Sequence, residues 1–365
     1  MLTVGVEEEF LLLDRDGAVA PVAPDVLRRA GDDQRIKPEL MTYQVEIVSD
    51  VHTDLGQLGA QLTGLRQRVA DAAAQSGARL VASGVAPFGD PGLAMLTDVP
   101  RYREIAARFP WAAAVSGTCG CHVHVGVPDR DLATQVVGRL RPWLPTLLAL
   151  TANSPFDGGH DTGWSSSRYR RLLQWPTFRP PGAWRSEARY DRTVDALVSA
   201  GAAVDRHSVY FLARLSQHWP TIEVRIADTC LEARDAALLA GIVRGLIATL
   251  AADVVASRPA EPMSGSALRA QLLAVAHHGA PTGVVRPRDA SGARSIEPLA
   301  EALLEKIRPA LEETHDLDHV QAGLARLLTT GTGAQQQRLL RAAPSPAGFV
   351  AALAAAAVPL EVTQS

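Results

Sequence analysis

The sequence predicts an α+β fold built on an antiparallel sheet. Four segments alternate apolar and polar side chains, which is the pattern of strands with one buried face. Longer segments with helical spacing lie between and after them, without the regular strand–helix alternation of parallel sheets. The 365 residues, 47% of them hydrophobic, are enough for a sizeable core. We expect a single catalytic domain over residues 1–365, mainly helical from about residue 265.

The expected strands are apolar or alternating runs that cover residues 3–13, 39–49, 79–84, 119–127, 208–215 and 221–227. The expected helices cover residues 54–77, 101–109, 129–152 and 232–256, the third with breaks near Pro142 and Pro145. Residues 154–186 are rich in Gly, Pro, Ser, Trp and Arg, which indicates a long functional loop region. The helix over 232–256 is strongly apolar, but Arg244 and Asp253 interrupt it, which favours a buried core helix over a membrane span.

The composition argues against several classes of protein. The formal net charge of −3 and the pI of about 6.4 suggest neither a nucleic acid nor a membrane as partner. Lys37 and Lys306 are the only lysines and neither ends a glycine-rich loop, which excludes a P-loop. The cysteines, Cys119, Cys121 and Cys230, are odd in number and lack zinc-type spacing. This cysteine usage and the lack of a signal peptide pattern at the N-terminus together predict a cytoplasmic protein.

Charged and histidine side chains gather on one face of four expected strands. In residues 3–13, Glu7 and Glu9 point to one side, and Glu8 points to the other side with the apolar residues. The same alternation selects one face of the other three strands, with the polar members Gln44, Glu46, His122, His124, Glu223 and Arg225. Any one of these strands could simply turn a polar face to water. The combined face lacks the usual solvated mixture of Lys, Thr and Ser, so we expect these strands to be neighbours around a site.

Such a site needs cations, because four carboxylates would converge in it. Two unit charges about 4 Å apart repel by roughly 4 kcal/mol at an effective dielectric constant of about 20, and Arg225 alone cannot offset that. Many carboxylate oxygens, few nitrogens and no suitable thiolate favour Mg²⁺ or Mn²⁺ over zinc. The candidate metal ligands are Glu7, Glu9, Glu46, His124 and Glu223. The imidazoles could alternatively hydrogen-bond a bound phosphate, and a metal cluster with arginines suits phosphoryl transfer.

Five ordered motifs carry a resemblance to a known family. They read "GVEEEFLLLD", "YQVEIVSDVHTDL", "CGCHVHVGV", "LPTLLALTANSPFDGGHDTGWSSSR" and "PTIEVRIADT". Over about residues 1–250 the chain closely resembles the carboxylate–amine ligase family, also known as glutamate–cysteine ligase type 2. The stretch "IEVRIADTCLEARDAALLAG" is also similar to a segment of glutamine synthetases, the parent superfamily.

The resemblance implies a curved, mainly antiparallel sheet that forms a cup, with helices packed on its outer face. It also implies a reaction in which ATP phosphorylates a small carboxylate, which is expected to be an amino acid, and an amine displaces phosphate to give an amide and ADP. Carried over to this sequence, it implies catalytic roles for Arg225, Arg214 and Arg168, and nucleotide-phosphate contacts for His122, His124 and Arg225. Asn153 and Ser154 are expected near the substrate. The resemblance identifies neither substrate. It also leaves the oligomeric state open, with a homo-oligomer among the alternatives.

Two other functions fit the same residues. A kinase on this fold would phosphorylate a guanidino or carboxylate group and release ADP without forming an amide. An inactive module would bind only metal or nucleotide, but the full set of four glutamates with Arg225 argues against loss of activity.

Overall fold

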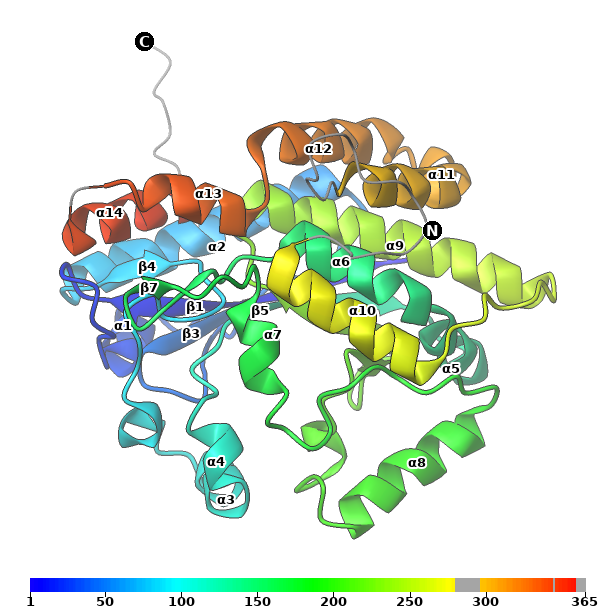
Figure 1. Cartoon of the computed structure of the whole chain (residues 1–365), viewed down its shortest axis with the longest axis horizontal. Coiled ribbons are helices and arrows are strands. Elements are labelled where there is room, and N and C mark those ends of the chain that lie inside the picture. The colour runs from blue at the N-terminus through cyan, green and yellow to red at the C-terminus, as the bar shows by residue number, and fades with distance from the viewer. Residues whose placement is uncertain (280–295, 344, 359–365) are drawn as a thin grey trace.

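The computed structural model describes residues 1–279, 296–343 and 345–358, and it combines a main antiparallel sheet with many helices (Figure 1). The sheet has the strand order β2-β3-β1-β5-β9-β8, and β4 pairs with the end of β1. These strands are β1 (Val4–Leu13), β2 (Ile36–Pro38), β3 (Gln44–Val48), β4 (Arg79–Val81), β5 (Gly120–Gly126), β8 (Ala213–Leu215) and β9 (Thr221–Asp228). All their pairings are antiparallel, which confirms the predicted α+β class.

Several elements differ from the sequence prediction. Residues 41–43 form a turn, so β3 covers only the second part of the predicted strand 39–49, and β2 precedes that turn. The strand predicted over 208–215 is shortened to β8, because the Asp205 side chain accepts a hydrogen bond from the Ser208 amide and caps a short 3₁₀ turn. The predicted loop region contains the hairpin β6 (Phe156–Asp157) and β7 (His160–Asp161) and the helix α7 (Ser167–Leu172).

The helices on one face of the sheet follow the prediction closely. They are α2 (Leu55–Gln75), which Asp54 caps through the Gln57 amide, and α9 (Ala233–Val255). Both lie above the sheet in Figure 1, and α11 (Glu297–Thr314) and α12 (Leu317–Thr330) cover α9 in turn. The predicted break near Pro142 separates α5 (Arg130–Arg139) from a 3₁₀ turn (Arg141–Trp143) and α6 (Leu144–Thr151).

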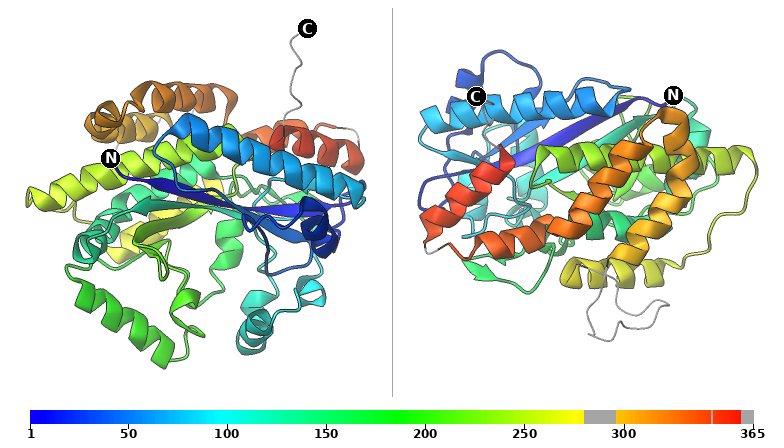
Figure 2. Two further views of the ribbon diagram at one scale, coloured as in Figure 1. Left: turned by 180° about the vertical axis from the view of Figure 1, so that it is seen from behind. Right: turned by 90° about the horizontal axis from the view of Figure 1, so that it is seen from above.

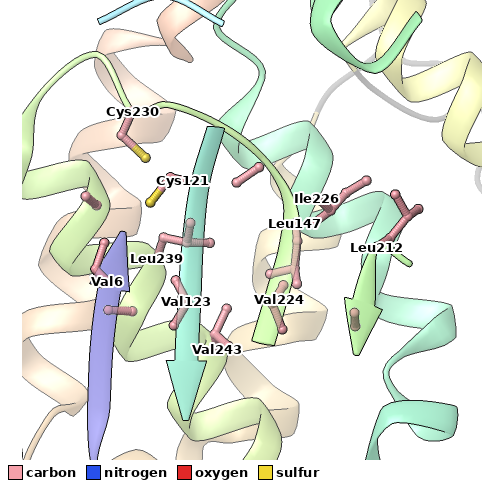
Figure 3. Close-up of a cluster of buried hydrophobic side chains, with 14 of the residues drawn as sticks. Val6, Cys121, Val123, Leu147, Leu212, Val224, Ile226, Cys230, Leu239 and Val243 are labelled. Carbon is pink, nitrogen blue, oxygen red and sulfur yellow. The ribbon is translucent and has the colours of Figure 1, made fainter. Parts of the chain in front are cut away.

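The apolar face of the sheet packs against α9. Figure 3 shows Val6, Val123 and Val224 from three neighbouring strands beside Leu239 and Val243 of that helix. Helix α9 is long and apolar enough to cross a membrane by length and composition, but 67% of its most apolar window is buried inside the protein. This burial supports the predicted core helix.

Glu8 lies on this apolar side, as strand alternation predicts. It forms an ion pair with Arg66 of α2, and both side chains are 0% exposed. Arg66 Nε donates to Glu8 at 3.0 Å, and the guanidinium also donates to the carbonyls of Cys230, Leu231 and Ala357. A single buried arginine therefore joins the central strand, a core helix and the C-terminal helix.

Other helices lie on the opposite face of the sheet. Figure 2 shows α3 (Pro100–Arg108), α4 (Pro110–Ala113) and α8 (Glu187–Ser199) on the side of the sheet away from α2. From residue 265 the described chain is mainly helical, with α10 (Gly265–His278) and α11 to α14, the last two being α13 (Gly333–Leu340) and α14 (Pro346–Ala357). The three cysteines are buried and free.

Candidate active site

The sheet register brings the predicted polar residues together on one face. Glu7 of β1 pairs with His122 of β5, and His124 pairs with Glu223 of β9. On the other side of β1, Glu9 pairs with Glu46 of β3. Three sets of backbone pairings therefore place the candidate metal ligands of four strands next to one another.

Glu7, His124 and Glu223 form the tightest group, since one potential ligand atom from each lies within 4.8 Å of the others. His124 Nδ1 hydrogen-bonds Thr221 Oγ1 at 3.1 Å, which turns Nε2 toward Glu7. This buried Nε2 lies 3.4 Å from Glu7 Oε1 and has no hydrogen-bond partner among the described residues. Two carboxylates and an unpartnered imidazole nitrogen are a suitable donor set for a divalent cation.

A second acidic group consists of Glu9, Glu46 and Glu39. The sequence pattern predicted Glu9 and Glu46 as site residues but not Glu39. Burial, followed by the charge of Glu9, raises the pKa of Glu39 to about 8. Burial and the charges of Glu7, Glu39 and Glu9 raise the pKa of Glu46 well above its usual value. Lys37 offers Glu46 only a distant positive charge, since its Nζ lies 3.9 Å from Glu46 Oε1. These carboxylates repel one another, so a bound cation would stabilise their ionised forms.

This repulsion predicts a pH-dependent response to Mg²⁺. Because the folded-state pKa of Glu39 is about 8 rather than 4.5, its stabilising contribution is present below pH 4.5 and is lost as the pH rises through 8. We expect Mg²⁺ to raise the melting temperature more at about pH 8 than at about pH 6. The cation binds the ionised carboxylates, and the deprotonation of Glu39 that this requires costs less free energy at the higher pH. Thermal unfolding with chelator or Mg²⁺ measures this effect, and Glu39→Gln should reduce the difference. An equal Mg²⁺ shift at both pH values would contradict it.

Two arginines neutralise Glu223. Arg214 Nε donates to Glu223 at 2.7 Å, and Arg214 Nη1 donates to the carbonyls of His207 and Val209. Arg225 also donates to Glu223. Burial alone would raise the pKa of Glu223, but Arg214 and Arg225 hold that pKa well below its usual value. Glu223 is therefore ionised, and Arg214 is fully engaged in holding it.

Arg225 lies at an irregularity in the sheet. The register between β5 and β9 shifts between Cys121 and Val123, so that Arg225 lies beside His122. Arg225 Nη1 is 3.5 Å from His122 Nδ1. Burial and the nearby Arg225 charge lower the pKa of His122, which keeps its ring neutral. Register shifts of this kind are common beside active sites because they redirect a side chain.

Arg168 is buried beside the same strands, and its Nε has no hydrogen-bond partner among the described residues. Asp228, at the end of β9, anchors the loop that carries Arg168. Asp228 accepts hydrogen bonds from the Asn153 amide, Ser154 Oγ at 2.7 Å and Ser166 Oγ at 2.8 Å. Asn153 and Ser154, which the resemblance had placed near the substrate, thus connect this loop to the sheet.

A cavity of about 100 Å³ opens beside these groups. Glu9, Arg168, Arg225 and the neutral His122 give it a polar side, and its other lining residues include Glu39, Ser116, Thr118, Trp175, Phe178 and Tyr210. A small polar molecule with an apolar portion would match both sides of this cavity.

Two solved structures define the class of fold. A bifunctional glutathione synthetase from Pasteurella multocida matches with a TM-score of 0.70 and 18% identity, over 97% of this chain and 52% of that chain. The present chain thus spans about half the length of that enzyme. A glutamate–cysteine ligase from Francisella tularensis, solved in complex with AMP, matches with a TM-score of 0.68 and 14% identity, over 99% of this chain and 89% of that chain. At these identities the likeness shows the fold.

The protein belongs to glutamate–cysteine ligase family 2, whose model matches residues 3–355. A Salinispora arenicola protein named "Putative glutamate–cysteine ligase 2" is 43% identical over an alignment of 340 positions that covers 92% of this chain and 89% of the relative. The Saccharopolyspora erythraea protein "Putative glutamate–cysteine ligase 2-2" is 40% identical over an alignment of 365 positions that covers 98% of this chain and 93% of the relative. The family resemblance inferred from the five motifs is confirmed.

Proposed function

We propose that this protein is an ATP-dependent, ADP-forming ligase that joins a small carboxylate, such as an amino acid, to an amine. The two acidic groups beside a cavity with buried arginines carry the proposal, because divalent cations held by the acidic groups, together with the arginines, would match the negative charges of a nucleotide and a carboxylate substrate. Membership of glutamate–cysteine ligase family 2 supports amide formation, and the related fold with bound AMP supports a nucleotide substrate. The acidic sheet face then serves as the floor of a cup.

Mg²⁺ or Mn²⁺ fits two places on this face. Glu7, His124 and Glu223 would hold one cation, since the buried His124 Nε2 makes no hydrogen bond in the described chain. Glu9 and Glu46, joined by Glu39, would hold another, since their mutual repulsion needs a positive charge. Such cations supply charge neutralisation for the nucleotide phosphates.

The chain's own residues bind and orient the reacting groups. Arg225 and the neutral His122 lie together, so they are placed to contact the transferring phosphate. The Nε of Arg168 has no hydrogen-bond partner among the described residues, and a carboxylate or phosphate oxygen of a substrate would accept its hydrogen bond. Trp175, Phe178 and Tyr210 form the apolar side of the cavity, which would limit access of water to a reactive acyl phosphate.

The acyl-phosphate route makes a specific isotopic prediction. The substrate carboxylate attacks the γ-phosphorus, and its oxygen stays on phosphate when the amine displaces it. Incubation with ¹⁸O-labelled carboxylate substrate, ATP and amine should therefore give labelled inorganic phosphate, ADP and an amide, measured by mass spectrometry. Excess chelator should abolish turnover, and added Mn²⁺ or Mg²⁺ should restore it.

Other products would assign a different reaction. ADP without an amide, over a broad screen of paired carboxylates and amines, would favour the kinase. AMP and pyrophosphate would indicate adenylation and contradict the acyl phosphate. Full turnover in chelator would contradict the proposed cation sites.

A further inference from the structure

A second cavity, of about 690 Å³, lies beside α8. It shares no lining residue with the cavity of about 100 Å³ beside the acidic groups, which we call the catalytic cavity. Four arginines line it, Arg141, Arg179, Arg189 and Arg192, together with Trp184 and Phe211. We call it the arginine pocket. None of its lining residues is Asp or Glu, although the formal net charge of the protein is −3.

The positive charges of the arginine pocket are not neutralised within the described chain. Arg179, Arg189 and Arg192 form no hydrogen bond or ion pair through their side chains there, although Arg179 lies over the Phe211 ring at 5.9 Å. Arg141 donates to the carbonyls of Pro181 at 2.6 Å and Met263 at 3.0 Å, so neutral oxygens use its hydrogen bonds. Burial, followed by the neighbouring charge of Arg269, lowers the pKa of Arg141.

Helix α8 separates its charges by face. Its acidic residues, Glu187, Asp191 and Asp195, are four positions apart and pair with Arg130 and Arg206. Arg189 and Arg192 lie on the face that lines the arginine pocket, with Thr193, Ala196 and Leu197. All three carboxylates form ion pairs with Arg130 or Arg206, and no ion pair among the described residues joins them to Arg189 or Arg192. The helix therefore presents unpaired positive charge to a concave surface.

A thin wall separates the arginine pocket from the catalytic cavity. Within it, the Tyr210 amide donates to Thr177 Oγ1 at 3.0 Å and the Leu212 amide donates to the Arg179 carbonyl at 3.1 Å. Phe178 and Tyr210 line the catalytic cavity, whereas their chain neighbours Arg179 and Phe211 line the arginine pocket. A movement of this wall would therefore change the lining of both cavities.

We propose that the arginine pocket binds a small polyanion, a metabolite with at least two phosphate or carboxylate groups, and that its occupancy alters the catalytic cavity through the shared wall. Arginine forks match the paired oxygens of phosphate and carboxylate, and several unpaired forks favour a ligand with more than one anionic group. The concave shape and the volume suit a small molecule. The coupling rests on the proposed function, but the binding does not.

Calorimetric titration with inorganic pyrophosphate and with citrate tests the binding, in chelator so that the acidic face holds no cation. The double variant Arg189→Ala/Arg192→Ala should bind each probe at least about tenfold more weakly than the unmodified protein, since charge-assisted contacts are lost. The control Arg29→Ala/Arg185→Ala removes the same charge from exposed positions outside the pocket and should bind normally. Arg225→Ala should also bind normally, because Arg225 lies in the catalytic cavity.

The outcomes separate the alternatives. Unchanged binding by the double variant, equal weakening by the control, or loss only in Arg225→Ala would each overturn the proposed site. Thermal unfolding of both double variants verifies that they are folded. Hydrogen exchange then tests the coupling: pyrophosphate should protect residues 177–179 and 208–212 in the unmodified protein and not in Arg189→Ala/Arg192→Ala. Binding without such protection would overturn the coupling, and neither measurement depends on ligase turnover.

Discussion

Replacing Glu8 with glutamine is expected to lower the free energy of unfolding by about 3–5 kcal/mol, because it leaves the guanidinium of Arg66 buried without a counter-charge. Arg66 would retain the carbonyls of Cys230, Leu231 and Ala357, which are neutral and cannot offset its desolvation. Urea denaturation of Glu8→Gln and of the unmodified protein measures the loss. The residual folded fraction should still bind Mn²⁺, because Glu8 lies on the face of β1 away from the acidic groups.

Glu7→Gln is the matched control, one position along the same strand. The Glu7 side chain is 26% exposed and faces the other acidic groups. Its replacement should change the free energy of unfolding by less than about 1 kcal/mol, as is usual for partly exposed positions, and should reduce turnover by orders of magnitude. Glu8→Gln combined with Arg66→Met should recover part of the lost stability, because it removes the unpaired charge. Equal stability losses for Glu7→Gln and Glu8→Gln would contradict the face assignment.

The contrast between Glu7 and Glu8 also shows what can be predicted from sequence. Alternation along a strand is a local property, so it correctly separated Glu7 and Glu9 from Glu8. The same local patterns predicted the antiparallel strands and the helices α2 and α9, whose long apolar stripes are distinctive.

The remaining features depend on contacts that are distant in the sequence or on departures from alternation. Glu39 fell inside a predicted strand at the wrong parity, and only the turn at residues 41–43 brings it beside Glu46. The shifted register around His122 places Arg225 next to this ring, and a register shift leaves no mark in the sequence pattern. Helix α8 was missed because its only buried residues are Tyr190 and Val194, which give too weak an apolar stripe.

Sequence similarity and local geometry also give different kinds of information on the arginines. The resemblance implied catalytic roles for Arg168, Arg214 and Arg225 alike, because motifs do not show what each side chain contacts. In the structure both arginines bind Glu223, but Arg214 also donates to two backbone carbonyls, whereas Arg225 also lies beside His122 in the lining of the cavity. We therefore propose that Arg214 positions Glu223 and that Arg225 contacts the transferring phosphate.

Because Arg225 is proposed to contact the phosphate, we expect Arg225→Ala to lose ligation and to retain its fold. Removing a charged contact to the transferring group typically costs on the order of 3 kcal/mol, so turnover should fall about a hundredfold or more. Glu223 would still be paired with Arg214 through the 2.7 Å hydrogen bond, so the buried carboxylate keeps a counter-charge. We expect Arg225→Ala to change the free energy of unfolding by less than about 1 kcal/mol and to keep Mn²⁺ binding.

Arg214→Ala is the control that separates a catalytic contact from a positioning role. It would remove the donor of the His207 and Val209 carbonyls as well as a partner of Glu223, so stability should fall by about 2–4 kcal/mol and Mn²⁺ affinity should weaken. ADP release, Mn²⁺ titration and urea denaturation of both variants measure the three quantities. Arg225→Lys should recover part of the turnover, because it restores the charge without the bidentate fork. Near-normal turnover in Arg225→Ala, or the same loss of stability in both variants, would contradict the separate roles of the two arginines.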